Sequence, residues 1–301
     1  MKLKTIHKSL IIIFIVFIVF ILMMMSRLSR YISNYLLDIN RFNIRTKYKN
    51  ITKIKNTTPI YIFIHLCNYG DHWKTIISSQ IKQIINSGLY DKCEHIFYGC
   101  SCDNCEEELK IFLKNYKKLS KLPAQPNYVH ENMTINCLLE FSKQQTENVH
   151  ILYLHSKGVT GRSVHQNYWR DYMMNYNVNM WEVCVNLLNN DYNTVGVNHK
   201  KLVFREIRDI PHYSGNFWWG RSDYIKKLDY VDESNFNNRY LAEVKLLDKK
   251  EKNKHINLSN EFWFSDFVLG LYSPIDYDHS LDYAEHKYYH ENPGELDIYI
   301  F

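Results

Sequence analysis

The chain has 301 residues, of which 46% are hydrophobic and 23% are charged. This length suffices for one large domain with a substantial core, and the composition excludes a disordered, collagen-like or proline-rich chain. The net charge of +5 is unevenly spread: residues 1–58 carry eleven basic side chains and one acidic one, so the remainder carries a net charge of −5. A basic tail on an acidic domain argues against a general nucleic-acid partner.

The first segment with a clear physical signature is the run of sixteen apolar residues from Leu10 to Met25. As a helix it would extend about 24 Å, slightly less than a bilayer core of about 30 Å, and flanking lysines can cover the difference by snorkelling. The alternative is a cleaved signal peptide, but no Ala-x-Ala cleavage pattern follows the run. We therefore expect residues 1–30 to be an uncleaved, single-pass membrane anchor. The flanking positive charges nearly balance, so they leave its orientation open.

Residues 31–58 are polar and basic and predict a stem between the anchor and a folded domain. Such a stem is either a solvated spacer or a segment that rests on anionic lipid headgroups. The folded domain is expected to occupy residues 59–301.

From residue 59 onward, short apolar runs alternate with helical patterns. Strands are expected at residues 60–65, 95–99, 126–130, 149–154, 194–197 and 213–219. Four helices are expected. The first begins at the cap residue Asp71 and ends at Gly88, and the second begins at a capping box formed by Asp103 and Glu106. The other two cover residues 132–145 and 165–190. This alternation predicts an α/β domain, a mostly parallel sheet flanked by helices with right-handed crossovers.

Polar and basic residues follow the fourth expected strand. In open α/β sheets, ligands bind at the carboxyl ends of the strands. Here histidine, lysine and arginine accompany two glycines, a set that offers a diphosphate positive charge and close access to the backbone. An ordinary polar loop between a strand and a helix is the alternative interpretation. The residues concerned are His155, Lys157, Gly158 and Arg162.

A second group of candidate residues combines a small polar turn with two tryptophans. A Ser-Gly-Asn turn lets a backbone approach a ligand closely, and adjacent tryptophans can place one ring on each side of a strand. An aromatic platform beside such a turn is typical of sugar binding. A tryptophan-rich core strand is the alternative. The residues are Ser214, Gly215, Asn216, Trp218 and Trp219.

Two carboxylates are candidates for general-base catalysis. Glu243 lies on a helical stretch and is either a base or an ordinary solvated acid of the helix surface. Asp266 is its nearest rival.

Four motifs occur in a fixed order along the chain: His-Ser-Lys-Gly at 155–158, Trp-Arg-Asp at 169–171, Ser-Gly-Asn-Phe-Trp-Trp at 214–219 and Arg-Tyr-Leu-Ala-Glu at 239–243. In this order they resemble a GT-A-like glycosyltransferase family of giant viruses and bacteria, similar to glycosyltransferases of the rhamnan-synthesis type. The resemblance covers residues 58–300 approximately. It implies a GT-A-like, Rossmann-like fold.

The resemblance also implies a division of the site into a donor side and an acceptor side. A nucleotide-sugar donor is expected near the first and fourth strands, at His65, His155, Lys157, Gly158 and Arg162. A glycan or glycoprotein acceptor is expected near residues 214–219, and Glu243 takes the position of the catalytic carboxylate of inverting members.

The chain departs from the family pattern at the metal site. GT-A enzymes usually hold Mn²⁺ or Mg²⁺ on the diphosphate with an Asp-x-Asp motif after the fourth strand. This chain has His155-Ser-Lys157 there. Either His155 joins a distant carboxylate or His279 in a metal site, or Lys157 and Arg162 replace the metal as fixed positive charges.

The expected function is a membrane-anchored glycosyltransferase. Glu243 would deprotonate an acceptor hydroxyl, which attacks the anomeric carbon of a nucleotide sugar. The alternative is a catalytically degenerate glycan-binding module on a membrane anchor, which the missing Asp-x-Asp motif favours.

Overall fold

The computed structural model describes residues 57–100, 105–123, 130–159, 164–204, 207–236, 238, 240–247, 254–257 and 298–300, and eight positions between 14 and 28. Those eight positions are helical and their side chains are exposed. Among the residues described, no helix is both long enough and apolar enough to cross a membrane. Nearly all of the expected anchor and stem lies outside the described residues.

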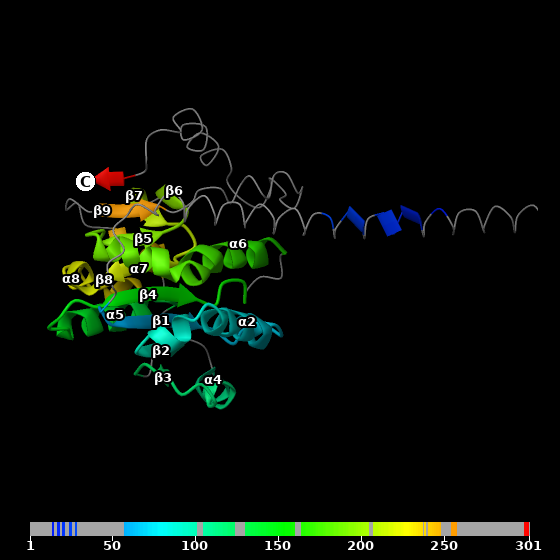
Figure 1. Cartoon of the computed structure of the whole chain (residues 1–301), viewed down its shortest axis with the longest axis horizontal. Coiled ribbons are helices and arrows are strands. Elements are labelled where there is room, and N and C mark those ends of the chain that lie inside the picture. The colour runs from blue at the N-terminus through cyan, green and yellow to red at the C-terminus, as the bar shows by residue number, and fades with distance from the viewer. Residues whose placement is uncertain are drawn as a thin grey trace, which may run out of the picture.

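A large mixed sheet forms the centre of the fold, with the strand order β10-β9-β5-β8-β4-β1-β2-β3 (Figure 1). Its strands are β1 (Ile60–Leu66), β2 (His95–Cys100), β3 (Leu119–Lys121), β4 (His150–His155), β5 (Thr194–Gly196), β8 (Trp218–Arg221), β9 (Lys254–Asn257) and β10 (Ile298–Ile300). A separate antiparallel pair is formed by β6 (His199–Phe204) and β7 (Ile207–Tyr213).

The sheet is mostly parallel, as expected. Its half β3-β2-β1-β4 is parallel throughout, and β5 and β9 in the other half also run parallel to each other. In contrast, β8 runs antiparallel to both β4 and β5, and β10 runs antiparallel to β9. The chain between β5 and β8 forms the β6–β7 pair instead of the helical crossover that a parallel neighbour requires. The fold is therefore α/β and Rossmann-like in its parallel half, with an antiparallel insertion.

Helices cover both faces of the sheet (Figure 1). One face packs against α2 (Trp73–Asn86), α4 (Cys105–Leu113), α6 (Val164–Met174), the π-helix η1 (Asn175–Asn179) and α7 (Trp181–Asn189). The other face packs against α5 (Asn132–Gln144), α8 (Ser222–Ile225), α9 (Tyr240–Val244) and η3 (Lys245–Leu247). The short helices α3 (Leu89–Lys92) and η2 (Glu233–Asn235) complete the described elements.

The two cores follow from the alternation of side chains along the central strands. In β1, Ile62 and Ile64 point into the core on the α2 side, whereas Phe63 points into the core on the α5 side. All three are at most 2% exposed. A strand buried on both faces reads as a continuous apolar run, which is why β1 and β4 were recognisable from the sequence.

Two helical expectations need correction. Helix α2 begins at Trp73 with His72 as its N-cap residue, so Asp71 is not the cap. The single helix expected over 165–190 is two α-helices separated by the π-helical turn η1 and by Met180, whose φ of −112° and ψ of 25° are not helical. Within that turn the indole N–H of Trp219 donates a hydrogen bond to the backbone carbonyl of Asn177. A side chain from outside the helix therefore bonds a backbone carbonyl at the point where the regular helix is interrupted.

The structure differs from the expected strands at two places. The strand described beside β2 is Leu119–Lys121, which the sequence did not indicate. Of the strand expected over 126–130, residues 126–129 lie outside the described residues, and His130 is a turn residue with φ of 48°. The strand expected over 213–219 is divided, because Gly215 and Asn216 have φ angles of 90° and 57°. Extended backbone cannot continue through such angles.

Candidate functional site

The candidate site begins with two histidines at the carboxyl ends of the neighbouring parallel strands β1 and β4. His65 and His155 are direct partners in the register of these strands. Side chains two residues apart share a face of a strand, so both histidines lie on the same face as Phe63 and Tyr153, the face that α5 covers. The sequence expectation that the donor residues His65 and His155 come together is consistent with this register.

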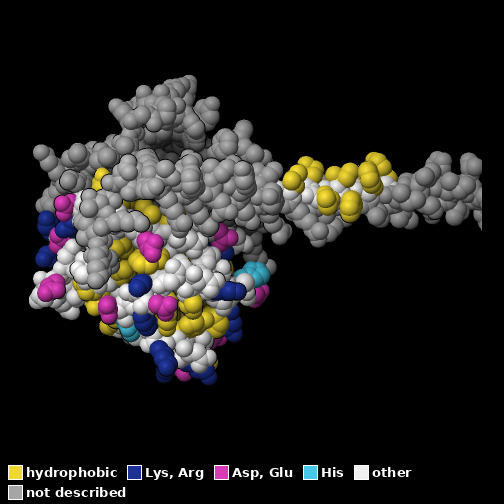
Figure 2. Space-filling view, in the orientation of Figure 1, with side chains coloured by type: hydrophobic (Ala, Val, Ile, Leu, Met, Phe, Trp, Pro, Cys, Tyr) yellow, Lys and Arg dark blue, Asp and Glu magenta, His cyan; other side chains and the backbone are white. Residues whose placement is uncertain are grey.

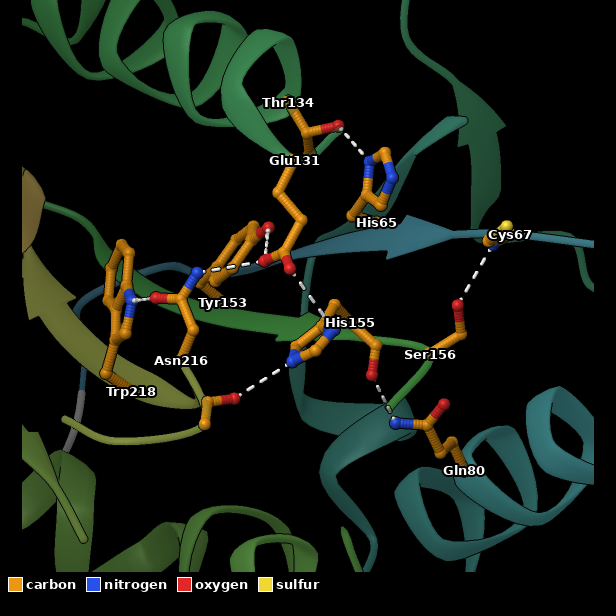
Figure 3. A network of polar contacts seen from close by, with 11 residues as sticks. His65, Cys67, Gln80, Glu131, Thr134, Tyr153, His155, Ser156, Asn216 and Trp218 are labelled. Carbon is orange, nitrogen blue, oxygen red and sulfur yellow. Dashed lines mark hydrogen bonds and ion pairs between the residues drawn. The ribbon is translucent and has the colours of Figure 1, made fainter. Parts of the chain in front are cut away.

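The start of helix α5 supplies two partners for these histidines (Figure 3). Glu131 is the N-cap residue of α5 and Thr134 lies one turn further on, so their side chains share one side of the helix. The hydroxyl of Thr134 lies 2.8 Å from Nδ1 of His65. One carboxylate oxygen of Glu131, Oε2, accepts a 2.8 Å hydrogen bond from the Tyr153 hydroxyl, and the other, Oε1, lies 3.4 Å from Nδ1 of His155.

The turn between β7 and β8 closes the network. The carbonyl oxygen of Gly215 accepts a hydrogen bond from Nε2 of His155 at 2.9 Å. The amide of Asn216 donates to Oε2 of Glu131 at 2.9 Å, and its Oδ1 accepts from the indole of Trp218 at 2.8 Å. Figure 3 shows these side chains converging from β4, α5 and the turn before β8. Residues far apart in the sequence are thus held in one polar cluster.

Gly215 is required at its position for two reasons. Its φ of +90° is a backbone conformation that side chains disfavour. A Cβ atom there would also lie 2.4 Å from the sulfur of Met173 and 3.1 Å from the ring of Trp169. The close packing against α6 therefore fixes the carbonyl that His155 binds.

The electrostatics of the cluster follow from its burial. Burial lowers the pKa of His155 to about 3, and the charge of Lys157 acts in the same direction. Burial likewise lowers the pKa of His65 to about 4, although the charge of Glu131 opposes this shift. Burial also raises the pKa of Tyr153 well above its ordinary value, with Glu131 adding to the effect. At neutral pH the two histidines are therefore neutral, and Tyr153 is a hydrogen-bond donor.

Lys157 and Gly158 lie just beyond the end of β4. The ammonium of Lys157 lies 3.8 Å from the centre of the Trp169 ring. The backbone carbonyl of Lys157 accepts a 2.9 Å hydrogen bond from the Arg170 side chain. Gly158 has a φ of +94°, and a Cβ atom there would meet Arg170 at 3.2 Å. The loop that was expected to bind a diphosphate is thus anchored on helix α6. Arg162 lies outside the described residues.

Glu243 lies on helix α9, which packs on the same face of the sheet as α5. Its charge raises the pKa values of Tyr153 and His155, which places it in the same electrostatic neighbourhood. Its side chain is half-buried, and among the described residues no hydrogen bond or ion pair engages its carboxylate. Asp266 and His279, the rival base and the candidate metal ligand, lie outside the described residues.

The two tryptophans of the expected acceptor platform lie in the core. Their rings occupy opposite faces of β8, as expected, but Trp218 is 2% exposed and Trp219 is fully buried. Trp218 stacks on Tyr153, and Trp219 donates its indole N–H to the carbonyl of Asn177. A ring that stacks on a sugar needs an exposed face. The structure therefore corrects the platform expectation: these rings are core side chains.

Glu131 is the residue of the polar cluster that sequence reasoning missed. It lies at a helix N-cap, where an acidic side chain suits the helix dipole and attracts no further notice. The available signal was its spacing. Positions 131, 135 and 138 fall on one face of the helix, so Glu131 lies in line with the buried side chains of Ile135 and Leu138. Within the described ranges, no set of three or more histidine, cysteine, aspartate or glutamate residues is arranged to hold a metal ion.

The three-layer fold and the polar cluster define an α/β protein whose candidate site lies at the carboxyl ends of β1 and β4. The chain belongs to the family DUF8361, described as a domain of unknown function, whose model matches residues 61–271. No match was found among curated proteins.

Several solved structures share part of the architecture. A cytidylyltransferase from Leptospira borgpetersenii serovar Hardjo-bovis is 12% identical, with a TM-score of 0.36 over 62% of this chain and 71% of that one. The 4-diphosphocytidyl-2C-methyl-D-erythritol synthase from Anaerococcus prevotii is 10% identical, with a TM-score of 0.36 over 71% and 100%. Residues 1–349 of TarS from S. aureus are 12% identical, with a TM-score of 0.32 over 71% and 65%. At these scores the similarity carries no argument about function.

Proposed function

We propose that this protein is a membrane-anchored glycosyltransferase that moves a sugar from a nucleotide-sugar donor to a hydroxyl group of a glycan or glycoprotein. The observation that carries the proposal is the convergence at the ends of β1 and β4 of His155, the Lys157 loop, and the carboxylates Glu131 and Glu243. This edge of a parallel sheet is where α/β proteins bind ligands. The order of the four sequence motifs supports the same function.

The donor side of the proposed site is the loop after β4. A nucleoside diphosphate leaving group develops negative charge, which a fixed ammonium offsets. Lys157 is held near the end of β4 by its contact with the Trp169 ring, and Gly158 lets the loop pack closely on Arg170 of α6. We assign the diphosphate to Lys157 and Gly158, with Arg162 as a further candidate. His155 and His65, which the sequence also placed there, are neutral at pH 7, and both ring nitrogens of His155 already face protein partners. We therefore give these two histidines a positioning role beside the loop.

The base of the proposed reaction is Glu243 rather than Glu131. Both oxygens of Glu131 already face partners, namely Tyr153 and Asn216 on one and His155 on the other. A general base must be able to receive a proton from the acceptor hydroxyl. Glu243 is half-buried and no described residue engages its carboxylate, so it suits this role better. Asp266 remains the rival candidate.

The turn Ser214-Gly215-Asn216 was expected to bind the acceptor, but all three residues are buried. They hold His155 and Glu131 in place by hydrogen bonds, and we do not assign them a contact with the acceptor. The alternative of a degenerate glycan-binding module is favoured by the missing Asp-x-Asp motif. The burial of Trp218 and Trp219 removes the aromatic platform that was expected to bind a sugar in either function. The apolar run Leu10–Met25 completes the proposal as the membrane anchor.

The test is a donor screen on the full chain purified in mild detergent. A panel of UDP-, GDP-, dTDP- and CMP-linked sugars is incubated with the protein, with and without Mn²⁺, and release of free nucleotide is measured. We expect release from one donor class. Binding of glycans without release from any donor would support the alternative module, and absence of both activities would contradict the proposed function.

A further inference from the structure

We propose that Asn132 is a positioning residue for Glu243. Its buried side chain fixes the segment from which helix α9 begins, and thereby sets where the carboxylate of Glu243 lies relative to His155. The inference rests on the proposed function only for the role of Glu243 as the base. The positioning of α9 itself can be measured without any sugar donor.

The side chain of Asn132 joins two parts of the chain that are distant in the sequence. Asn132 is the first residue of α5, directly after Glu131, and it is fully buried. Its amide nitrogen donates to the backbone carbonyl of Phe236 at 2.7 Å and to that of Asn238 at 3.0 Å. Because a carbonyl oxygen can only accept, both hydrogens of the amide are committed and its orientation is fixed.

The segment that Asn132 holds leads directly into α9. The backbone N–H of Leu241, in the first turn of this helix, donates to the carbonyl oxygen of Asn238 at 3.4 Å. One carbonyl oxygen therefore accepts from the side chain of Asn132 and from the start of α9. Glu243 follows in the same helix, which has five residues. A helix this short has little stability of its own, so its position depends on contacts with the rest of the protein.

Packing alone does not define the orientation of α9. Ala242 and Leu246 are at most 2% exposed and lie in the core on the α5 side. Apolar burial is non-directional, so it holds the segment against the sheet without fixing its rotation. Hydrogen bonds are directional. The hydroxyl of Tyr224 donates to the carbonyl of Leu246 after the helix, at 2.6 Å, and Asn132 bonds the segment before it. Asn132 is thus the directional contact on the side where the chain enters α9.

Asn136 lies one turn further along α5 and bonds an earlier part of the same connection. Its amide nitrogen donates to the carbonyl of Val231 at 2.9 Å, and its Oδ1 accepts from the backbone N–H of Val231 at 2.8 Å. Asn132 differs, because within the described part of the chain no group donates to its Oδ1, although this atom is buried. A buried acceptor without a donor lowers stability. This cost favours a role of Asn132 in placing the segment over a role in stability alone.

The same turn of α5 contacts both sides of the polar cluster. Glu131, directly before Asn132, places its Oε1 3.4 Å from Nδ1 of His155. Asn132 holds the segment that leads to Glu243, whose charge also acts on His155. The start of α5 therefore relates the position of Glu243 to that of His155. Since misplacement of a reacting group by about 1 Å can cost about 10²-fold in rate, loss of the Asn132 contacts should lower turnover.

The experiment compares Asn132→Leu with the matched control Asn136→Leu, which also loses two hydrogen bonds, in the full chain in detergent. Leucine has nearly the shape of asparagine but donates no hydrogen bond. Hydrogen exchange followed by mass spectrometry measures the protection of peptides that cover α9 and η3. We expect the amides of α9 to exchange about tenfold faster or more in Asn132→Leu, and at the parental rate in Asn136→Leu.

A second variant covers the case in which Asn132→Leu does not fold. Asn132→Ser keeps a polar group, but a hydroxyl carries one hydrogen and can donate to only one of the two carbonyls. Exchange of α9 should again be faster than in the parent.

Turnover distinguishes positioning from a general loss of structure. With the donor found in the screen, Asn132→Leu should lower kcat about ten- to a hundredfold and leave the KM for the donor within about twofold. In the Glu243→Gln background the same substitution should change kcat by less than about twofold, because two residues that act through one another are not additive.

Two results would overturn the inference. One is exchange of α9 at the parental rate in the folded Asn132 variant. The other is a loss of kcat from Asn132→Leu that is equally large in the parent and in the Glu243→Gln background. A parent chain without transferase activity would contradict the proposed function, and the exchange measurement would then still decide whether Asn132 positions α9.

Discussion

Asn216 donates a 2.9 Å hydrogen bond to Glu131 from a position 85 residues further along the chain. The bond joins the turn before β8 to the first residue of the α5 region, across the carboxyl ends of β1 and β4. Asn216 is fully buried and has a φ of +57°. This single contact ties the buried turn before β8 to the carboxylate that faces His155.

Removing the Asn216 side chain should destabilise the protein. Asn216→Gly tolerates the positive φ but leaves the buried indole N–H of Trp218 without its acceptor. A buried polar group that loses its partner costs about 1–3 kcal/mol. Urea denaturation measures this loss. Glu131→Gln keeps an acceptor oxygen and should lose less, and an equal or larger loss in that variant would contradict the account of the network.

Adding one methyl group at Gly215 should cost more than adding it at another glycine with positive φ. Gly215→Ala incurs both the disfavoured backbone angle and a clash with Met173, whereas Gly88→Ala, with φ of +78°, has no atom within 4 Å of the new Cβ. We expect a loss of about 1 kcal/mol for Gly88→Ala and about 2–4 kcal/mol for Gly215→Ala. Thermal or urea unfolding of the two variants provides the comparison. Equal losses would show that the packing against α6 is not as tight as described.

Stability should fall as the pH is lowered from about 6.5 to about 4, partly through His150. Burial lowers the pKa of His150 from 6.5 to about 4, with the charge of Arg221 contributing. Above pH 6.5 this histidine is neutral in both the folded and the unfolded protein. Between the two pKa values only the unfolded chain binds the proton, so the free energy of unfolding decreases by up to about 1.4 kcal/mol per pH unit.

The measurement is the pH dependence of urea unfolding in the parent and in His150→Gln. The variant should show a shallower decline over this window, whatever its absolute stability, while His65 and His155 still contribute. A slope identical to that of the parent would contradict the assigned protonation of His150.

Nucleoside diphosphate binding should depend on Lys157. Lys157→Ala removes a charge-assisted contact, which is worth about 1.5–3 kcal/mol, so affinity should fall about ten- to a hundredfold. Isothermal titration calorimetry with a nucleoside diphosphate measures it. Lys143→Ala is a matched control, because Lys143 also lies over an aromatic ring, that of Tyr230, but away from the ends of β1 and β4. An equal effect in both variants, or none in either, would move the donor site elsewhere.

Local pattern predicted the parallel half of the fold well. The strands β1, β2 and β4 and the helices α2 and α5 follow from apolar runs and helical spacing, because burial on one or both faces imposes those periods. The antiparallel insertion of β8 could not be read in this way. Its place between β4 and β5 depends on the β6–β7 pair and on the turn at Gly215. Pairing between strands that are distant in the sequence leaves no local pattern.

The candidate site was predicted only in part. His65, His155 and Lys157 were recognisable because they follow apolar strands in the sequence. Glu131 was not, because its role depends on the way α5 lies over β1 and β4 rather than on any local motif. The burial of Trp218 and Trp219 was equally a tertiary property, since a Trp-Trp pair on a strand suits a surface platform or a core.

The measurement that tests the central claim most directly compares sugar transfer by the parent chain and by Glu243→Gln. With the donor found in the screen, turnover and donor affinity are measured for both proteins, and Asp266→Asn is measured beside them. The account predicts that Glu243→Gln lowers turnover about 10²–10⁴-fold, because the base is lost, while donor binding and thermal stability stay at parental values. Turnover at the parental rate in Glu243→Gln, with or without a loss in Asp266→Asn, would contradict the assignment of Glu243 as the base.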